Sequence, residues 1–381
     1  MSAALQLKVK IANKIEELPQ EEWDSFFPGV IENHSFLKTL DESSFDQFSF
    51  RYILIYENNT PVGAAPCFIM DFPLDIAVNG PLKLFFSALK KALPKVISPK
   101  IVICGFPMGI GRIGITAQDP GQVMEAIYEG LEKIAAENKA ALIFFKDFGK
   151  SYENLFKPFL AKGFSKLEGF PTTEMNLHFK GFDDYLKTLS RVSRDGLKRN
   201  FKKIDAGIKI DLEEKNALED EELSQVYGLY LQTYNKQELG FEKLTLDFFK
   251  NISRNMPQET RYFLWRIDGR IVAFALCLVK GEYFIDYYLG FDYALSNRYH
   301  LYFVRFRDLM SWCIRHGIKK YEMGATSYEA KRRLGFNFVR LYFYVKHRNR
   351  LINRLLIPLI PFIKPENFDP VFKQMKKDGV N

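Results

Sequence analysis

The sequence predicts an α/β (α+β) protein with two lobes, each a mixed, largely antiparallel sheet flanked by helices. At 381 residues the chain exceeds the roughly 100–200 residues of a typical domain, so two lobes are the default expectation. Helical patterns alternate with short apolar strands, and several strands are joined by short polar turns. We expect the lobes at residues 1–170 and 171–350, followed by an apolar and basic extension at 351–381.

The composition is typical of a soluble globular protein. Hydrophobic residues make up 47% of the chain and charged residues 26%, which suits two buried cores. The net charge of +8 favours contact with phosphates, nucleic acid or an anionic membrane without choosing among them. Cys67, Cys104, Cys277 and Cys313 lie far apart and include no CxxC pair, so we expect core thiols in a reducing cytoplasm and no metal site.

The first lobe is expected to begin with a strand and two short helices, followed by a hairpin. Its polar turn, Glu57-Asn-Asn-Thr-Pro61, is of the kind that joins antiparallel strands. In chain order we expect strand Leu5–Ile11, helices near Glu21–Phe27 and His34–Glu42, strands Arg51–Tyr56 and Val62–Met70, a helix near Leu82–Val96, strand Ile101–Gly105, a helix near Gln122–Asn138 and strand Ala141–Phe145.

The second lobe repeats this plan after Pro171 and contains an antiparallel meander with turns at Asp268-Gly269 and Lys280-Gly281. A crossover through a long helix then leads to a strand that can lie parallel to the last meander strand. In chain order we expect strand Thr173–Phe179, a basic helix near Phe182–Ala206, strand Gly207–Leu212, helices near Asp220–Tyr234 and Leu244–Asn255, strands Tyr262–Ile267, Ile271–Val279 and Glu282–Leu289, helix Arg298–His316 and strand Lys319–Met323.

A faint internal repeat favours two related lobes. Ile103-Cys-Gly-Phe106, a helix and Leu142-Ile-Phe-Phe145 parallel Leu289-Gly-Phe291, a helix and Lys320-Tyr-Glu-Met323. The shared order of strands and helices supports this interpretation more than the short stretches of identical residues do.

Neither end of the chain has the pattern of a membrane-spanning segment. The first fifteen residues alternate Lys with aliphatic residues and lack the apolar core of a secretory signal. The apolar stretch Leu351–Ile363 is interrupted by Arg354, Pro358 and Pro361 and falls short of the ~20 residues that span a bilayer. We expect it to pack onto a lobe, with surface attachment to a membrane as the alternative. The expected location is the cytoplasm, with peripheral contact to the inner face of the membrane left open.

Two carboxylates interrupt strands that are otherwise apolar and aromatic. Asp286 lies within the expected strand Glu282–Gly290, and Glu322 lies on the next strand. Each can be a hydrogen-bonded partner of a nearby Arg or backbone group, or a general base or amine-binding anion in a cleft.

Tyr328 follows the second of these strands, where its hydroxyl could protonate a leaving thiolate or simply cover the core. Lys331 lies one helical turn further on. It could contact phosphate or stabilise an oxyanion, whereas a solvated lysine is the ordinary alternative.

The start of the long helix is where we expect a pyrophosphate, because a helix N-terminus offers unpaired N–H groups and a partial positive charge. Ser296 and Asn297 are the expected N-caps, and Arg298 lies in the first turn. A capped helix without a ligand is the alternative.

The basic helix near Phe182–Ala206 places Arg191, Arg194, Lys198 and Lys202 near one face. A solvated face is the ordinary explanation, and a phosphorylated acceptor, a nucleotide or tRNA is the alternative. Other chemistries have weaker support: the Gly109–Gly114 run lies too far before a helix for a dinucleotide turn, and the five histidines form no HExxH motif.

On these features the chain resembles the acyl-CoA N-acyltransferase (GNAT) superfamily, specifically its two-lobed members related to the FemAB peptidoglycan aminoacyltransferases and predicted bacterial N-acyltransferases. The likeness covers roughly Phe182 to Tyr344. It rests on the order and spacing of the basic Arg191–Arg199 helix, the Asp268–Leu276 strand with its turn, and Tyr321–Phe336.

The resemblance implies tandem GNAT-like lobes, the first of them degenerate, and an N-acyltransferase in the second. Strands Glu282–Gly290 and Lys319–Met323 would splay apart, so that a thioester enters from one side and an amine from the other. The amine would attack the acyl carbonyl directly, with Asp286 or Glu322 as base and Tyr328 as acid. Lys331 matches the lysine of the family's Gly…Lys…Gly pattern.

The resemblance also implies the ligands. The donor substrate would be acyl-CoA, without a metal, and the acceptor an amine of a small molecule or cell-envelope precursor. The expected cofactor contacts are Leu289, Gly290, Asn297, Arg298, Tyr299 and His300, and the expected acceptor contacts are Arg194, Lys198, Tyr234 and Tyr288.

The chain departs from the family's Gln/Arg-x-x-Gly-x-Gly/Ala cofactor loop, because Leu295–His300 contains no glycine. This leaves room for an aminoacyl-tRNA donor, which the basic helix would also suit. A catalytically silent module that binds a glycan or a membrane is the third hypothesis.

Overall fold

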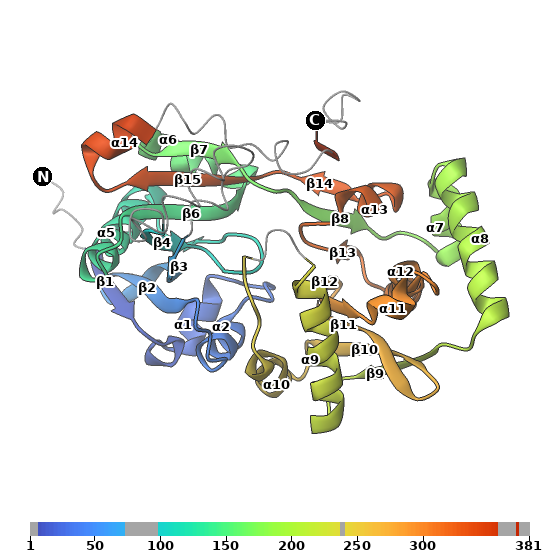
Figure 1. Cartoon of the computed structure of the whole chain (residues 1–381). Coiled ribbons are helices and arrows are strands. Elements are labelled where there is room, and N and C mark those ends of the chain that lie inside the picture. The colour runs from blue at the N-terminus through green and yellow to red at the C-terminus, as the bar shows by residue number, and fades with distance from the viewer. Residues whose placement is uncertain (1–6, 73–97, 237–240, 357–370, 373–381) are drawn as a thin grey trace, which may run out of the picture. The chain divides into compact units, whose positions relative to one another are not determined.

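The computed structural model describes residues 7–72, 98–236, 241–356 and 371–372, and the chain forms two compact units (Figure 1). Unit 1 contains the chain up to Pro28, Phe45–Pro171 and the chain from Arg340 onward; unit 2 contains Gly29–Ser44 and Thr172–Val339. Each unit has its own sheet and its own cluster of buried apolar side chains. The α/β class and the two mixed sheets expected from the sequence are confirmed.

Unit 1 is built on an eight-stranded sheet in the order β1-β2-β3-β4-β6-β15-β7, with β5 paired to β3. Only β4 and β6 pair in parallel along this path, through the crossover helix α5. Its elements are β1 (Leu7–Ala12), α1 (Gln20–Ser25), β2 (Ser49–Glu57), β3 (Thr60–Asp71), β4 (Lys100–Cys104), β5 (Gly114–Ile115), α5 (Pro120–Glu137), β6 (Leu142–Gly149), α6 (Glu153–Ala161), β7 (Ser165–Glu168), β15 (Leu341–His347) and α14 (Arg350–Leu356).

Local sequence explains the best-predicted parts of unit 1. Asn58 and Asn59 have φ values of 48° and 66°, the left-handed conformation that a two-residue hairpin turn needs, and they join β2 to β3. Asp119 accepts hydrogen bonds from the N–H groups of Gly121 and Gln122 and caps α5. The buried stripe of α5, which includes Val123 and Ile127, packs on the sheet.

Unit 2 is built on a seven-stranded sheet in the order β14-β8-β13-β12-β11-β10-β9, in which only β12 and β13 are parallel. Figure 1 shows α9 and α12 beside the central strands of this sheet. The elements are α2 (His34–Asp41), β8 (Thr172–Asn176), α7 (Phe182–Thr188), α8 (Arg191–Gly207), β9 (Asp211–Lys215), α9 (Asp220–Tyr234), α10 (Leu246–Asn255), β10 (Thr260–Ile267), β11 (Arg270–Lys280), β12 (Tyr283–Phe291), α11 (Tyr293–Ser296), α12 (Leu301–Arg315), β13 (Lys320–Glu322), α13 (Tyr328–Arg333) and β14 (Asn337–Val339).

The basic helix expected near Phe182–Ala206 is two helices, α7 and α8. Leu189 adopts an extended conformation with ψ of 154°, and the Ser190 hydroxyl accepts a hydrogen bond from the Ser193 N–H at 3.2 Å, which starts a new helix. Because α8 then continues to Gly207, the strand expected at Gly207–Leu212 begins only at Asp211.

The two contact units differ from the continuous ranges expected at 1–170 and 171–350 in two segments. Residues 29–44, which include α2, pack within unit 2, where α2 contacts α10. Strand β15 pairs with β6 and β7 of unit 1, although it follows the last strand of unit 2. Helix packing decides the first placement and strand pairing the second. Both join segments far apart in sequence, which local patterns do not encode.

Some expectations fall outside the described residues. These are the helix near Leu82–Val96 and the part of the 351–381 extension beyond Leu356, apart from Val371 and Phe372. Among the helices that the structure describes, none is both long and apolar enough to cross a bilayer. All four cysteines are buried free thiols, as expected.

Candidate functional site

Strands β12 and β13 pair over only three residues, and the pairing stops where β13 ends. Their parallel register runs from Tyr283 opposite Lys320 to Ile285 opposite Glu322, where β13 ends. Strand β12 continues to Phe291 and stays paired with β11 on its other side. Beyond Ile285, therefore, β12 has no register partner on β13 among the described residues. The splaying of the two strands that the resemblance implies stays a prediction.

A β-bulge at Tyr287 marks this point in β12. In the register with β11, Cys277 lies opposite Asp286 and Leu276 opposite Tyr288, so Tyr287 has no opposing residue. The bulge reverses the alternation of side chains: Asp286 contacts α12, whereas Tyr288, two residues on, packs against Tyr230 of α9. Asp286 and Tyr288 therefore contact different helices, α12 and α9, at the place where pairing with β13 has ended.

Asp286 forms a buried ion pair with Arg305 of α12. Arg305 Nη1 donates to both carboxylate oxygens at 2.6 and 2.5 Å, and the Tyr321 hydroxyl donates to Oδ2 at 3.1 Å. The two charged side chains are 1% and 0% exposed. The geometry favours the structural interpretation of Asp286 over that of a free base, because the buried Arg305 guanidinium engages both carboxylate oxygens.

Arg305 is a buried residue that sequence reasoning did not single out. Its Nε and Nη2 groups have no hydrogen-bond partner among the described residues. A signal was present, because Leu301, Arg305 and Leu309 recur every four residues and so share the buried face of α12. A charge at such a position requires a partner in the core, and Asp286 on the preceding strand was the nearest candidate.

Glu322 ends β13, where pairing with β12 stops, and is also buried. Its Oε1 accepts a hydrogen bond from the Thr172 hydroxyl at 2.8 Å, and its Oε2 accepts one from the Tyr283 hydroxyl. These donors orient the carboxylate without neutralising it by a direct ion pair. Of the two proposed bases, Glu322 therefore has the geometry better suited to accept a proton.

Further carboxylates surround the bulge. The Tyr287 hydroxyl is buried without a hydrogen-bond partner among the described residues, and its pKa is raised well above the ordinary value by burial and then by the charges of Glu32, Glu242 and Glu322. Sequence reasoning missed Glu32, because it lies in the early segment that folds into unit 2. A site with this charge favours a cationic or amine-bearing ligand.

Lys331 is buried rather than solvated. Its Nζ donates to the carbonyl oxygens of Met323, Gly324 and Ala325 at 2.7, 3.1 and 3.0 Å, which uses all three of its donors. Burial lowers the pKa of Lys331 to about 7, opposed by the charges of Asp286 and Glu322.

The turn that Lys331 holds contains strained backbone, since Thr326 and Ser327 have φ values of 75° and 51°. This arrangement suits a lysine that shapes the turn after β13. Its role as a phosphate or oxyanion contact stays a prediction.

Tyr328 begins α13 directly after this turn and is 2% exposed. Its ring lies 5.6 Å from that of Phe338, and Lys331 Nζ lies 6.0 Å from its centroid. Tyr328 and Lys331 therefore stand together beside the end of β13. The acid role of Tyr328 stays a prediction.

The start of α12 differs from the expectation. The N-cap is His300, with φ of 47° and no side-chain cap, whereas Ser296 and Asn297 lie at the end of the short helix α11. That helix forms because the Asp292 carboxylate accepts a hydrogen bond from the Ala294 N–H. Asn297 and Arg298 are exposed and Tyr299 and His300 are half-buried, so all four of these expected cofactor contacts flank the first turn of α12.

The other residues expected to contact the cofactor or the acceptor lie in two places: on β12 and α9, and on α8. Tyr288 donates a hydrogen bond to Glu242 at 3.0 Å, and burial together with Glu242 raises the pKa of Tyr234, so these two tyrosines share one carboxylate. Leu289 is half-buried against the core. A Cβ on Gly290 would lie 2.7 Å from the Leu229 carbonyl carbon, so the close approach of α9 explains this glycine.

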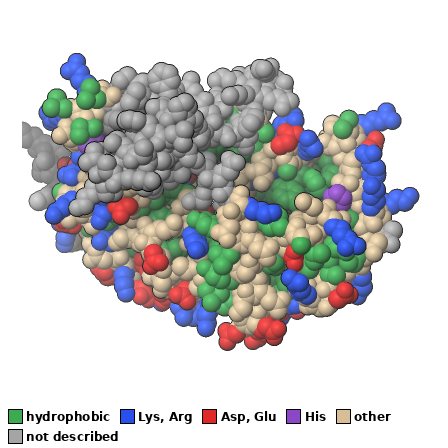
Figure 2. All heavy atoms as spheres, in the orientation of Figure 1, with side chains coloured by type: hydrophobic (Ala, Val, Ile, Leu, Met, Phe, Trp, Pro, Cys, Tyr) green, Lys and Arg blue, Asp and Glu red, His purple; other side chains and the backbone are tan. Residues whose placement is uncertain are grey.

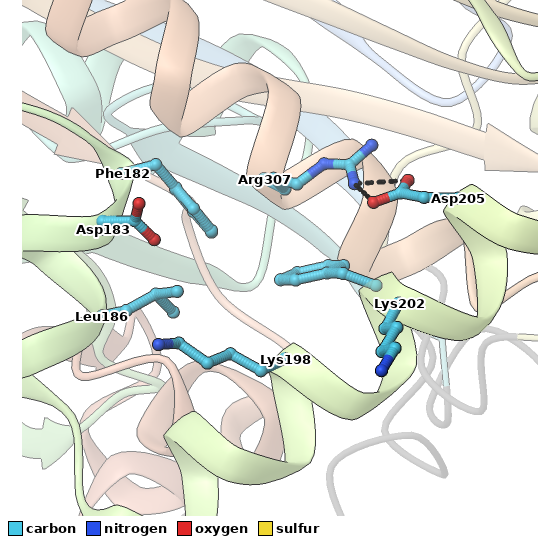
Figure 3. A pocket seen from close by; sticks show the side chains of 8 residues that line it. Phe182, Asp183, Leu186, Lys198, Lys202, Asp205 and Arg307 are labelled. Carbon is cyan, nitrogen blue, oxygen red and sulfur yellow. Dashed lines mark hydrogen bonds and ion pairs between the residues drawn. The ribbon is translucent and has the colours of Figure 1, made fainter.

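Arg194 and Lys198 lie on α8, on a surface separate from the bulge residues in the contacts that the structure describes. Figure 2 shows Lys and Arg side chains gathered along the edge where α8 lies. Lys198 lines a shallow pocket of roughly 600 Å³ between α7, α8 and α12 (Figure 3), whose apolar lining includes Phe182 and Phe201. Arg307 of this pocket is paired with Asp205 at 2.9 Å.

No group of three or more His, Cys, Asp or Glu side chains is arranged to hold a metal ion within the described part of the chain.

Comparison with known proteins places this architecture in a family. A model of the FemAB-like family, described as peptidoglycan biosynthesis/recognition, matches residues 14–356. A curated relative, the putative 8-amino-7-oxononanoate synthase 2 of Mycobacterium tuberculosis, is 18% identical over 333 residues. The match covers 82% of this chain but only 42% of the relative, so the chain spans less than half of that protein's length.

Several solved structures share the fold. A crystal structure of FemX has a TM-score of 0.57 at 13% identity and covers 91% of this chain and 100% of its own. A tandem GNAT protein from the clavulanic acid biosynthesis pathway gives 0.54 at 10% identity, with coverages of 90% and 98%. L-PGS from Bacillus licheniformis gives 0.52 at 11% identity, with coverages of 91% and 96%. The fold is thus that of two GNAT-like units in tandem.

Proposed function

The chain belongs to the FemAB-like family, and from this premise we propose that it transfers an acyl or aminoacyl group from an activated carrier to an amine. The observation that carries the proposal is the end of β12–β13 pairing at Ile285 and Glu322, beside a buried carboxylate. An opening between strands lets a carrier and an acceptor approach one carbonyl carbon from opposite sides. The transfer then needs a base, an acid and donors for the developing oxyanion.

In the proposed step the amine nitrogen attacks the carbonyl carbon of the carrier. A C–N bond forms, the bond from that carbon to the carrier's sulfur or oxygen breaks, and Glu322 takes the proton that the amine loses. The leaving thiolate or alkoxide receives a proton from the Tyr328 hydroxyl. Glu32 and Glu242 would attract the acceptor as a cation before it is deprotonated.

For the carrier we propose a coenzyme A thioester whose phosphates meet the first turn of α12. The exposed Asn297 and Arg298 and the half-buried His300 would line that contact. The tandem GNAT protein from the clavulanic acid pathway, whose structure is described as being without AcCoA, supports this choice as a relative in fold.

An aminoacyl-tRNA is the second candidate carrier, and the basic surface of α8 favours it. Lys198 and Lys202 are exposed there beside the apolar pocket that contains Phe201. Basic side chains next to an aromatic ring suit a nucleic acid backbone and a stacked base.

Binding and transfer measured together separate the candidates. Acetyl-CoA and longer acyl-CoA thioesters would raise the melting temperature, and mass spectrometry would detect an N-acylated product from a panel of amines. Salt-sensitive binding of charged tRNA, with transfer of its amino acid, would instead assign the second carrier. Glycan binding without transfer from either carrier would contradict both and leave a recognition module.

A further inference from the structure

Three basic side chains of unit 1 meet at a surface pocket. This pocket has no part in the proposed transfer reaction. Lys162, Lys346 and Arg350 line a pocket of roughly 460 Å³, together with His347. The Asn353 side-chain amide donates to the Gly163 carbonyl at 2.9 Å and so holds α14 beside the end of α6.

Positive charge exceeds negative charge around this pocket. Lys162 is paired with Glu125 at 2.5 Å, and Lys346 donates to the Tyr128 hydroxyl at 2.7 Å. Glu132 accepts hydrogen bonds from that hydroxyl and from Arg348.

Arg350 has no ion-pair partner among the described residues, and neither does Arg354 one turn later. Burial lowers the pKa of Lys346, and the charges of Arg350 and Lys162 add to this shift against the opposing charge of Glu132. An anion such as a phosphate group would relieve the repulsion among these cations.

The same helix exposes an apolar face. Leu351 and Leu355 are 78% and 72% exposed, and Ile352 is 43% exposed. Residues four apart lie on one side of a helix, so the two leucines form a continuous apolar strip. In Figure 2, hydrophobic and basic side chains lie together at the corner where Figure 1 labels α14.

We propose that this pocket and α14 form a docking surface for an anionic phospholipid bilayer. Headgroup phosphates would enter between Lys162, Lys346 and Arg350, while Leu351 and Leu355 would insert among the acyl chains. The apolar strip is the reason to prefer a bilayer over a free phosphate, because a soluble anion would use the cations alone. Docking of this surface on a bilayer requires no transfer reaction.

Cosedimentation of the full chain with vesicles tests this surface. The expected result is at least tenfold stronger binding to phosphatidylcholine vesicles that contain a quarter phosphatidylglycerol than to pure phosphatidylcholine vesicles, with attraction weakened by salt. Arg350→Glu should weaken binding about tenfold, and the double variant Leu351→Asn/Leu355→Asn by a similar factor, with circular dichroism unchanged.

Matched controls come from exposed residues of unit 2. Arg191→Glu, whose side chain is 88% exposed, and Val192→Asn, at 84% exposure, should each change vesicle binding by less than about twofold. Equal losses in these controls, or binding that does not distinguish the two vesicle types, would overturn the proposal. Calorimetry with inorganic phosphate completes the test. Phosphate binding without vesicle binding would also overturn the proposal of bilayer docking.

Discussion

Arg305 Nη1 lies 2.6 and 2.5 Å from the two carboxylate oxygens of Asp286, and the pair joins α12 to β12 inside the core of unit 2. A buried ion pair contributes little compared with well-packed apolar residues, yet removing one partner leaves an uncompensated charge in the core. The pair thus fixes how α12 sits under the strand at the bulge.

Asp286→Asn or Arg305→Leu should therefore each lower the free energy of unfolding by about 3–5 kcal/mol, measured by denaturant titration. The double variant Asp286→Leu/Arg305→Leu should lose less than either single variant. The more exposed pair Arg333–Glu329 provides the control, since Arg333→Leu should cost less than about 1 kcal/mol. Single core variants as stable as this control would contradict the assignment.

Glu322→Gln should lower kcat for the transfer by roughly 10²–10⁴-fold, because the amide keeps the shape of the side chain but cannot take the proton of the amine. The hydrogen bond from Thr172 to Oε1 can persist. Initial rates across amine concentrations check this result. Glu329→Gln, on the exposed side of α13, should leave the rate unchanged; a fully active Glu322→Gln would remove Glu322 from the mechanism.

Tyr328→Phe should reduce turnover at least tenfold with an unchanged melting temperature, because the ring still packs on Phe338 while the proposed proton donor is lost. Acyl donors that carry a better leaving group should restore part of the lost rate. Tyr342→Phe in unit 1 serves as the matched control. If both variants turn over like the wild type, Tyr328 only covers the core.

The lowered pKa of Lys331 predicts that the stability of the folded chain depends on pH. The folded chain releases the Lys331 proton near pH 7, whereas the unfolded chain keeps it to about 10.5, so raising the pH above 7 favours the folded state. Between pH 7.5 and 9.5 the free energy of unfolding should rise by about 2 kcal/mol in the wild type relative to Lys331→Met. Parallel stability profiles for the two proteins would refute a lowered pKa.

Gly290→Ala should destabilise unit 2 by about 1–3 kcal/mol, because the new Cβ would lie 2.4 Å from Phe274 Cε1 and 2.8 Å from the Leu229 carbonyl oxygen. Gly228→Ala on α9 has nothing within 4 Å of its new Cβ and should be neutral or stabilising. Thermal unfolding compares the two. Equal melting temperatures would show that α9 does not approach β12 this closely.

Elements whose signal is local were predicted well. The turns at Asn58-Asn59 and Asp268-Gly269 need positive φ values that these residue types tolerate, and both appear as expected. Helix α9 has the predicted bounds because acidic residues fill its first turn and its apolar positions recur at helical spacing. The break between α7 and α8 was missed because the capping signal of Ser190 lies inside a continuous amphipathic pattern.

The sequence by itself determined the two-unit α/β architecture, the order of the strands that follow one another in hairpins, and the pair of carboxylates near the end of β12 and β13, because periodicity and turn chemistry act over a few residues. Only the tertiary structure decided which partners those carboxylates have: Arg305 for Asp286, Thr172 and Tyr283 for Glu322, and Glu32 beside Tyr287. It also placed β15 in the first sheet. These outcomes depend on contacts between residues tens to hundreds of positions apart, whose energies no local pattern contains.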